Sequence, residues 1–156
     1  MMKYAGVCIA VRDVKLARKF YEDLFGLEVF QDYGINVSFR CGISLQQEFG
    51  RITGIPQDKI VMKPRNMELY FEENHFDEFV RKLSLYPGIH YVDGGVKEAG
   101  WGQRSIRFYD LDGHMIEVGE SLKMVAEHFL HSGMTMEETS RRMDVSIPDL
   151  EKLLNG

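Results

Sequence analysis

Residues 101–120 contain two segments of alternating polar and apolar residues around a short turn, in the sequence WGQRSIRFYDLDGHMIEVGE. This alternation predicts half-buried strands at Ser105–Tyr109 and Met115–Val118. The turn between them contains Asp112-Gly113, which supplies side-chain hydrogen bonds and a residue that tolerates positive φ. One face of the predicted hairpin is apolar and carries Ile106, Phe108, Ile116 and Val118. Arg107 and Glu117 share the opposite face, where they form either a buried ion pair or part of a site.

The hairpin closes the second of two similar series of elements. The first series is a strand, a helix and three strands, predicted at residues 4–11, 15–25, 27–33, 35–40 and 43–47. Asp13 is placed to cap that helix, and Gly26 to end it. The second series has a strand at 66–72, a helix from residue 76 to about residue 86, a strand at 89–97 and then the hairpin. This internal repeat predicts an α+β fold of two βαβββ modules, at about residues 1–60 and 61–120.

Two segments lie outside the repeat. Residues 48–65 form a polar connection that is longer than the usual loop, which predicts a lid, a linker or a short extra helix. Residues 121–156 change to an all-helical pattern, in which Thr135 with Glu138 predicts a capping box and Ser146 before Pro148 predicts a helix start. This tail resembles a helix-turn-helix. Its four Lys and Arg against six Asp and Glu would repel phosphate, so we expect it to pack on the domain or on a second subunit.

The composition excludes several classes of protein. The length of 156 residues fits one ordinary domain at residues 1–120 with the tail as an appendage, and the chain can bury a sizeable core without disulfides. The net charge of −5 argues against a general nucleic-acid or anionic-membrane partner. Cys8 and Cys41 are too few for a disulfide framework. The charged start and the lack of an apolar run of about 18 residues predict neither a signal peptide nor a membrane span, hence a cytoplasmic protein.

Two motifs resemble those of the vicinal oxygen chelate superfamily, which contains glyoxalase I, bleomycin-resistance proteins and extradiol dioxygenases. The segment Val11-Arg12-Asp13 followed by FYEDLFG at residues 20–26 is similar to the family's V-x-D…FY-x-x-x-LG signature. The segment RFYDLDGHMIE at residues 107–117 is similar to its closing FxDPDGxxIE, with Leu111 in place of Pro. The resemblance covers about residues 1–120. It implies a glyoxalase-like fold in which paired modules form a cupped mixed sheet around one site, and often a homodimer.

The resemblance also implies positions for a divalent metal. The first family ligand, a histidine, falls on Gly6, which cannot ligate, and the last falls on Glu117. The matching position of the second module is Glu68, and Gln46 is a candidate on the fourth strand of the first. All five histidines lie elsewhere. Two carboxylates and an amide suit Mg²⁺ or Mn²⁺ better than Zn²⁺ or Ni²⁺, and the missing imidazole leaves open that no metal binds.

Each candidate has a structural alternative. A buried Glu68 or Glu117 needs a cation, which Arg107 or Arg40 can supply. Arg107 can also clamp a ligand carboxylate or phosphate. Tyr70 shares strand parity with Glu68. Aromatic Trp101 and small Cys8 are candidates for the wall of a binding site, and Cys8 has no activating base beside it in sequence.

Two hypotheses follow. In the first, the protein is an enzyme of the glyoxalase type, a lyase or isomerase acting on a small oxygenated metabolite, with Glu117 as metal ligand or general base aided by Glu68. In the second, it is a metal-free binding or drug-sequestering protein, in which Tyr70 and Trp101 stack on the ligand and Arg107 and Glu117 fix its polar ends.

Overall fold

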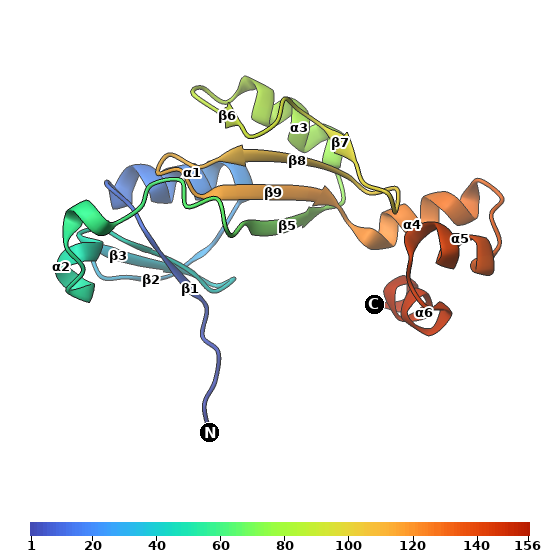
Figure 1. Ribbon diagram of the computed structural model, residues 1–156, viewed down its shortest axis with the longest axis horizontal. Helices are drawn as coiled ribbons and strands as arrows, with labels where there is room; N and C mark the ends of the chain where they lie inside the picture. The colour runs from blue at the N-terminus through green and yellow to red at the C-terminus, as the bar shows by residue number, and fades with distance from the viewer. The chain divides into compact units, whose positions relative to one another are not determined.

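The computed structural model describes all residues from Met1 to Gly156, in two compact units. The first unit contains residues 1–67 and the turn at 109–114, and the second contains residues 68–108 and 115–156. Each unit has its own sheet, one of four strands and one of five, with helices beside it (Figure 1). The predicted α+β class is therefore confirmed.

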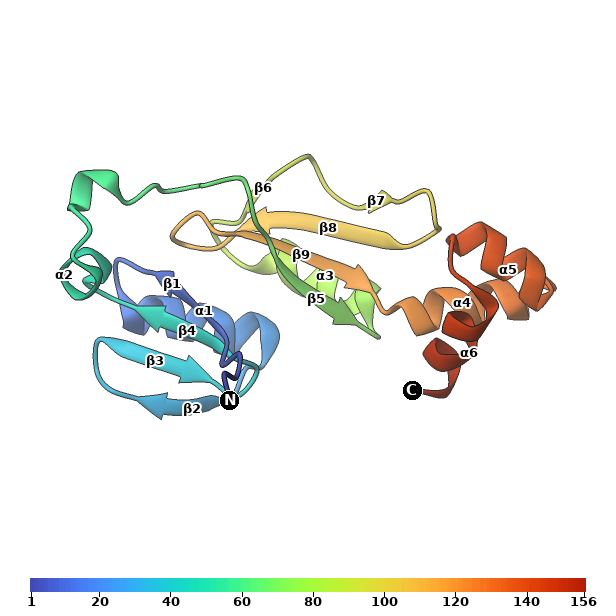
Figure 2. The same cartoon turned by 60° about the horizontal axis from the view of Figure 1, so that its bottom comes forward.

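The first unit follows the predicted element order. Its elements are β1 (Val7–Ala10), α1 (Val14–Phe25), β2 (Val29–Asp32), β3 (Asn36–Phe39), β4 (Ile43–Gln46), α2 (Phe49–Thr53) and the 3₁₀ turn η1 (Gln57–Lys59). The strand order is β1-β4-β3-β2, in which β1 pairs parallel with β4 and the other pairs are antiparallel. Figure 2 shows β2, β3 and β4 side by side in this sheet. The long connection forms α2 and η1, so a short extra helix is the predicted alternative that the structure contains.

Helix α1 begins and ends where the sequence predicts. The Asp13 side chain accepts hydrogen bonds from the backbone N–H groups of Lys15 and Leu16, at 2.9 and 3.0 Å. Gly26 ends the helix with a φ of 62°, the left-handed conformation that glycine adopts without strain. The buried face of α1 packs on β3 and β4. The core of this unit is formed by Ile9, Val11, Val14, Ala17, Phe20, Tyr21, Leu24, Val37, Phe39, Ile43 and Leu45.

Two local predictions for this unit were wrong. The first strand begins at Val7 rather than Tyr4, because Gly6 has a φ of 133° and a Cβ there would lie 1.9 Å from the Gly42 carbonyl oxygen. The spacing of apolar residues along α1 also predicts that Leu16 lies on the buried face of the helix, but Leu16 is 60% exposed, whereas Tyr21 is completely buried.

The second unit repeats the order with one change. Its elements are β5 (Leu69–Glu73), α3 (Phe76–Leu85), β6 (His90–Tyr91), β7 (Lys97–Glu98), β8 (Arg104–Tyr109) and β9 (Met115–Glu120), followed by the tail helices α4 (Leu122–His131), α5 (Met136–Met143) and α6 (Ile147–Asn155). The sheet order is β5-β9-β8-β6, with β7 also paired to β8. The single strand predicted at 89–97 is instead two short strands. Gly94 and Gly95 both have positive φ, which interrupts the extended backbone between them.

The β8–β9 hairpin has the two faces that its sequence predicts. Ile106, Phe108, Ile116 and Val118 are at most 3% exposed. They form the core of this unit together with Leu69 and three residues of α3, namely Phe76, Phe79 and Leu83.

The tail helices have the predicted caps and a small core of their own. Thr135 and Glu138 form the capping box of α5, and Ser146 caps α6. The tail core contains Val125, Ala126, Met143 and Leu150. The tail also contacts the β7–β8 segment, where Arg142 pairs with Glu98 at 3.2 Å.

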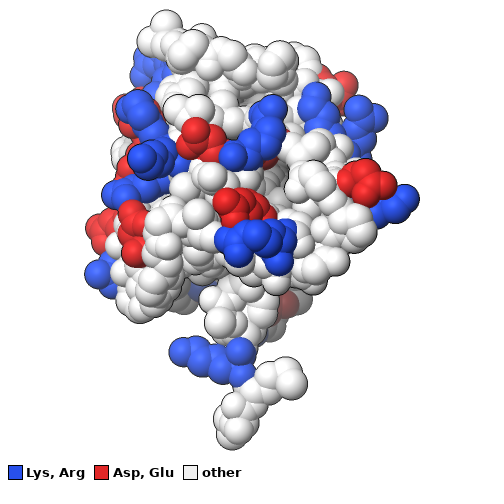
Figure 3. Space-filling view, turned by 90° about the vertical axis from the view of Figure 1, so that its left-hand side faces the viewer, with Lys and Arg blue, Asp and Glu red and all other residues white.

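The surface carries charges of both signs. On the face drawn in Figure 3, Lys and Arg are interspersed with Asp and Glu, so this face has no broad patch of one sign. None of the helices combines the length and the apolar content that crossing a membrane requires.

Candidate functional site

The face of the second sheet opposite α3 carries four of the eight predicted site residues. We call it the polar face, and it holds Glu68, Tyr70, Gln103, Ser105, Arg107 and Glu117. Tyr70 of β5 lies directly beside Glu117 of β9 in the parallel pairing of these strands. Side chains alternate along a strand, so the alternation that directs the apolar side chains toward α3 directs these polar side chains to the opposite face.

Arg107 binds both glutamates of the polar face. Its Nε lies 3.0 Å from Glu68 Oε2, and its Nη2 lies 2.7 Å from Glu117 Oε2. We call these three residues the Arg107 cluster. The Glu117 side chain is 10% exposed, against 33% for Glu68 and 38% for Arg107. The ion pair predicted between Arg107 and Glu117 is therefore present, and it includes a second carboxylate.

The two glutamates of the cluster hold protons differently. Burial raises the pKa of Glu117, and its hydrogen bond with Glu68 raises it further. Burial also acts to raise the pKa of Glu68, but hydrogen bonds with Arg107 and Glu117 outweigh it and lower that pKa. A proton taken up by the cluster therefore resides on Glu117, which then donates to Glu68.

Gln103 is a central residue of the polar face that the sequence did not single out. It is 4% exposed, and its Nε2 donates to the Tyr70 hydroxyl at 2.8 Å and to the Glu120 carbonyl at 2.7 Å. Its Oε1 accepts a hydrogen bond from Trp101 Nε1 at 3.0 Å. Gly119 leaves the space for it, since a Cβ there would lie 2.7 Å from Gln103 Nε2. A glycine inside strand β9 was the available signal, because such glycines mark close approaches.

The first unit contains the candidates Gln46, Cys8 and Arg40. Gln46 is 7% exposed, and its amide is fully engaged: Nε2 donates to the carbonyls of Ile35 and Gln47, and Oε1 accepts from Asn36. Cys8, one strand away on β1, is an exposed free thiol whose pKa is raised by partial desolvation. A raised pKa disfavours the reactive thiolate, so Cys8 lacks the activation that a nucleophile needs.

Arg40 has a different partner from those predicted for it. It pairs with Glu28 at 3.2 Å and lies 5.7 Å from the centre of the Phe30 ring. Of the two arginines considered as partners for Glu68 and Glu117, only Arg107 contacts them.

The turn at 109–114 forms a second polar network, within the first unit. Asp110 accepts hydrogen bonds from the Tyr21 hydroxyl at 2.7 Å and from the backbone and ring nitrogens of His114, both at 2.8 Å. Burial would raise the pKa of Asp110, but these hydrogen bonds and the His114 charge hold it below its usual value. Asp112 binds the backbone and side chain of Arg12 at 2.9 and 3.0 Å. The Asp-x-Asp-Gly motif thus has a structural role: it joins α1 and the end of β1 to the turn.

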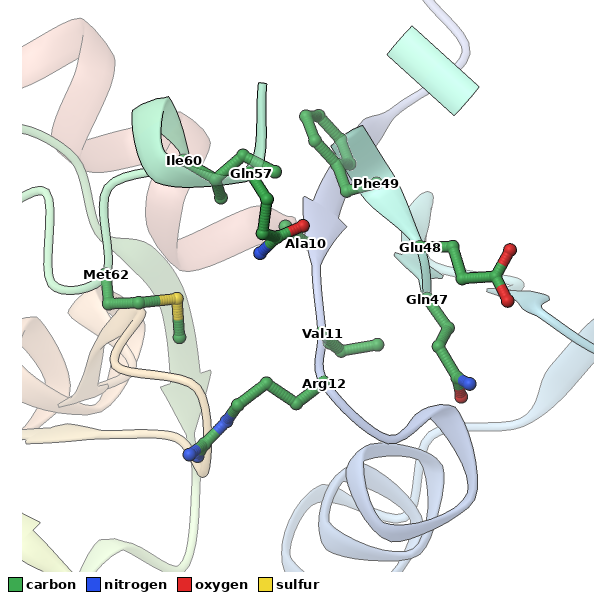
Figure 4. Close-up of a pocket in the computed structure, with 9 residues that line it drawn as sticks. All are labelled: Ala10, Val11, Arg12, Gln47, Glu48, Phe49, Gln57, Ile60 and Met62. Carbon is green, nitrogen blue, oxygen red and sulfur yellow. The ribbon is translucent and has the colours of Figure 1, made fainter. Parts of the chain in front are cut away.

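A cavity of about 260 Å³ lies in the first unit beside the connecting segment 48–65. In Figure 4, Gln57 and Met62 extend from that segment toward Ala10 and Val11 of the β1 end, whereas Glu48 points away. The remaining lining residues are Arg12, Gln47, Phe49 and Ile60. The connecting segment therefore forms a cavity wall. The lining contains no histidine, and its one carboxylate, Glu48, pairs with Arg51.

The residues proposed as metal ligands do not fit a divalent ion. Nowhere does the structure bring together three or more His, Cys, Asp or Glu side chains that could hold one. The Arg107 guanidinium already binds both Glu68 and Glu117, and the Gln46 amide is used by its own strand neighbours. At Gly6 the backbone contact with Gly42 leaves no room for any ligating side chain.

Comparison with known proteins decides the family. Residues 4–123 match the glyoxalase-like domain family. The chain belongs to that family. The resemblance read from the two sequence motifs is therefore confirmed, and the matched region ends just inside α4, so most of the tail lies beyond it.

Solved structures agree with this assignment. The glyoxalase-like protein is 34% identical to a protein of unknown function from Agrobacterium tumefaciens str. C58, with a TM-score of 0.67, over 78% of this chain and 96% of that one. It is 18% identical to a glyoxalase/bleomycin resistance protein/dioxygenase family enzyme from Burkholderia phytofirmans PsJN, with a TM-score of 0.65, over 78% and 100% of the two chains. It is 19% identical to the fosfomycin resistance protein FosX from Listeria monocytogenes, with a TM-score of 0.57, over 89% and 98%. The curated proteins include no significant match.

Proposed function

We propose that this glyoxalase-like protein binds a small oxygenated organic molecule on the polar face of its second sheet, without a metal ion. The observation that carries the proposal is the position of Arg107, whose guanidinium contacts the carboxylates of both Glu68 and Glu117. A divalent ion on the same two carboxylates would have to displace this cation. In this proposal an arginine takes the place that the family resemblance assigns to a metal ion.

The chemistry of the cluster favours a ligand with a carboxylate, carbonyl or hydroxyl oxygen. A guanidinium has five N–H donors in a planar fork, and the two glutamate contacts use only part of them. Glu68 is the more exposed carboxylate, so an anionic ligand group would compete with Glu68 rather than with Glu117. The Tyr70 ring is 47% exposed and supplies an adjoining flat surface, held by Gln103.

Ligand-observed NMR on chelator-treated protein tests this function. The panel consists of small hydroxy acids, oxo acids and polyols, with and without added Mn²⁺ or Zn²⁺. We expect binding that added metal leaves unchanged and that Arg107→Gln abolishes. Arg104→Gln is the matched control, because Arg104 also binds two carboxylates, Glu120 and Asp77, in the same unit. Binding that requires added metal would contradict the proposal.

Proton transfer at Glu117 is the second candidate function. The raised pKa of Glu117 makes it a stronger base than an ordinary carboxylate, and Arg107 beside it would stabilise negative charge developing on a carbonyl oxygen. In this case the protein would exchange the α-protons of a bound oxo acid or hydroxyketone with D₂O. Glu117→Gln would abolish the exchange while ligand binding remains. Binding without any exchange would leave sequestration as the function.

A further inference from the structure

A second cavity lies in the second unit, between Trp101 and the tail helices. It has a volume of about 250 Å³. Its walls are Trp101 before β8, Leu122 of α4, Met143 of α5, Val145 between α5 and α6, and Asp149, Leu150 and Leu153 of α6. The Arg107 cluster contributes nothing to this lining, so the cavity is separate from the site proposed above.

The lining is almost entirely apolar. Six of the seven side chains are Trp, Leu, Met or Val. The exception, Asp149, already has partners for its carboxylate, since it accepts from the Ser146 hydroxyl at 2.7 Å and from Lys152 Nζ at 2.9 Å. A charged ligand would lose its hydration here without gaining a free counter-charge, which is unfavourable.

Both walls are held in place by contacts of their own. The Trp101 indole donates to buried Gln103, so its ring orientation is fixed although the residue is 45% exposed. Gly102 beside it lies against the Phe129 ring, because a Cβ at Gly102 would be 2.3 Å from Phe129 Cζ. Opposite, Leu150 is completely buried in the tail core and Met143 is 5% exposed. A cavity between two fixed walls persists instead of collapsing.

The size of the cavity limits what can occupy it. An engineered apolar cavity of about 150 Å³ is sufficient to bind benzene. A volume of 250 Å³ accepts a somewhat larger molecule, but it is too small for a helix or strand of another protein. We propose that this cavity is a binding site for a small, uncharged aromatic or aliphatic molecule, recognised by contact with Trp101 and the tail helices. The tail, which lies largely outside the matched family region, thereby gains a role in ligand binding.

Trp101 provides the measurement, because it is the only tryptophan in the chain. Iodobenzene is uncharged and quenches indole fluorescence on contact through its heavy atom. We expect iodobenzene to quench Trp101 emission with a saturable dependence on concentration, and 4-iodobenzoate to give only the linear dependence of random collisions. Linear quenching by iodobenzene, or saturable quenching by both probes, would contradict the proposal.

Variants that fill the cavity test whether iodobenzene binds inside it. Val145→Phe and Leu153→Phe both add volume to the lining, and either folded variant should lose saturable quenching. Leu130→Phe adds the same type of side chain to α4 outside the lining, and it should keep saturable quenching. Persistence of saturation in a folded cavity-filling variant would place the probe elsewhere and overturn the assignment.

A measurement on the wild-type chain is independent of these variants. Toluene should raise the Tm in a concentration-dependent manner, since a ligand that binds only the folded state stabilises it. An unchanged or lowered Tm across the toluene series would also overturn the proposal.

Discussion

Arg107 Nη2 and Glu117 Oε2 lie 2.7 Å apart on the polar face of the second sheet. The same guanidinium contacts Glu68 at 3.0 Å, so one internal cation lies between the two carboxylates that the family resemblance offers as metal ligands. This arrangement gives both carboxylates a partner that is not a metal ion.

Removing the Arg107 charge should create affinity for a divalent cation. In Arg107→Gln the carboxylates of Glu68 and Glu117 lose their counter-charge, so we expect Mn²⁺ binding that calorimetry detects in the variant and not in the wild type. The variant should also lose about 1–2 kcal/mol of unfolding free energy, because the ion pairs are only partly buried.

Arg104→Gln is the control for this effect. It frees a pair of carboxylates in the same unit, those of Asp77 on α3 and Glu120 on β9, that share one arginine in the same way. Equal Mn²⁺ affinity in both variants would mean that the gain comes from net charge rather than from the geometry of the Arg107 cluster.

Asp110 should make the stability of the protein sensitive to acid. Its folded-state pKa is lowered, so its ionised form stabilises the fold above the unfolded-state pKa of about 3.9, and this contribution is lost as pH falls through the folded-state value. Asp110→Asn should cost about 3 kcal/mol at pH 7. Urea titrations from pH 7 to pH 3 should show that the difference in unfolding free energy between the wild type and Asp110→Asn becomes smaller as the pH falls.

The exposed Asp93 serves as the comparison. Its carboxylate pairs with Lys97 at the surface. Asp93→Asn should leave the pH dependence of the unfolding free energy nearly unchanged. If the loss of unfolding free energy in Asp110→Asn stays constant down to pH 3, the proposed role of Asp110 ionisation is wrong.

Gly102→Ala should destabilise the docking of the tail. The new Cβ would meet the Phe129 ring at 2.3 Å, and the φ of 89° is unfavourable for alanine. We expect a loss of about 1–3 kcal/mol, measured by thermal denaturation. Gly100→Ala is the matched control, since a Cβ at residue 100 would meet open space. We expect this variant to change the unfolding free energy by less than about 0.5 kcal/mol. Equal losses in both variants would indicate a general effect on this loop.

Thr139→Val should stabilise the tail. The hydroxyl of Thr139 is buried in α5 without a hydrogen-bond partner, and valine has nearly the same shape without the polar atom. The expected gain is about 1–2 kcal/mol, read from the midpoint of urea denaturation. Thr135→Val in the same helix should have the opposite sign, because Thr135 caps α5. A loss of stability in Thr139→Val would show that its hydroxyl has a partner in solution.

Local patterns predicted much of the fold. Alternation in the β8–β9 hairpin assigned Ile106 and Phe108 to the core and Arg107 and Glu117 to the opposite face, because side-chain direction in a strand is fixed by position. Cap residues such as Asp13 and Thr135 marked helix starts for an equally local reason. The prediction of a single strand at 89–97 was wrong because Gly94 and Gly95 adopt positive φ, and composition alone does not reveal the φ of a glycine.

The sequence predicted where the candidate site lies better than it predicted which side chains contact one another there. The sequence by itself indicated the family through its two motifs, and it predicted the order of elements and the face on which Arg107 and Glu117 would lie, since the last two follow from spacing along the chain. Glu68 was a candidate through the family resemblance alone. Only the tertiary structure decided that Arg107 contacts both glutamates, that Arg40 pairs with Glu28, and that buried Gln103 links Tyr70 to Trp101. Each of these contacts joins side chains from separate elements, and the distance between such side chains is set by packing rather than by their separation in sequence.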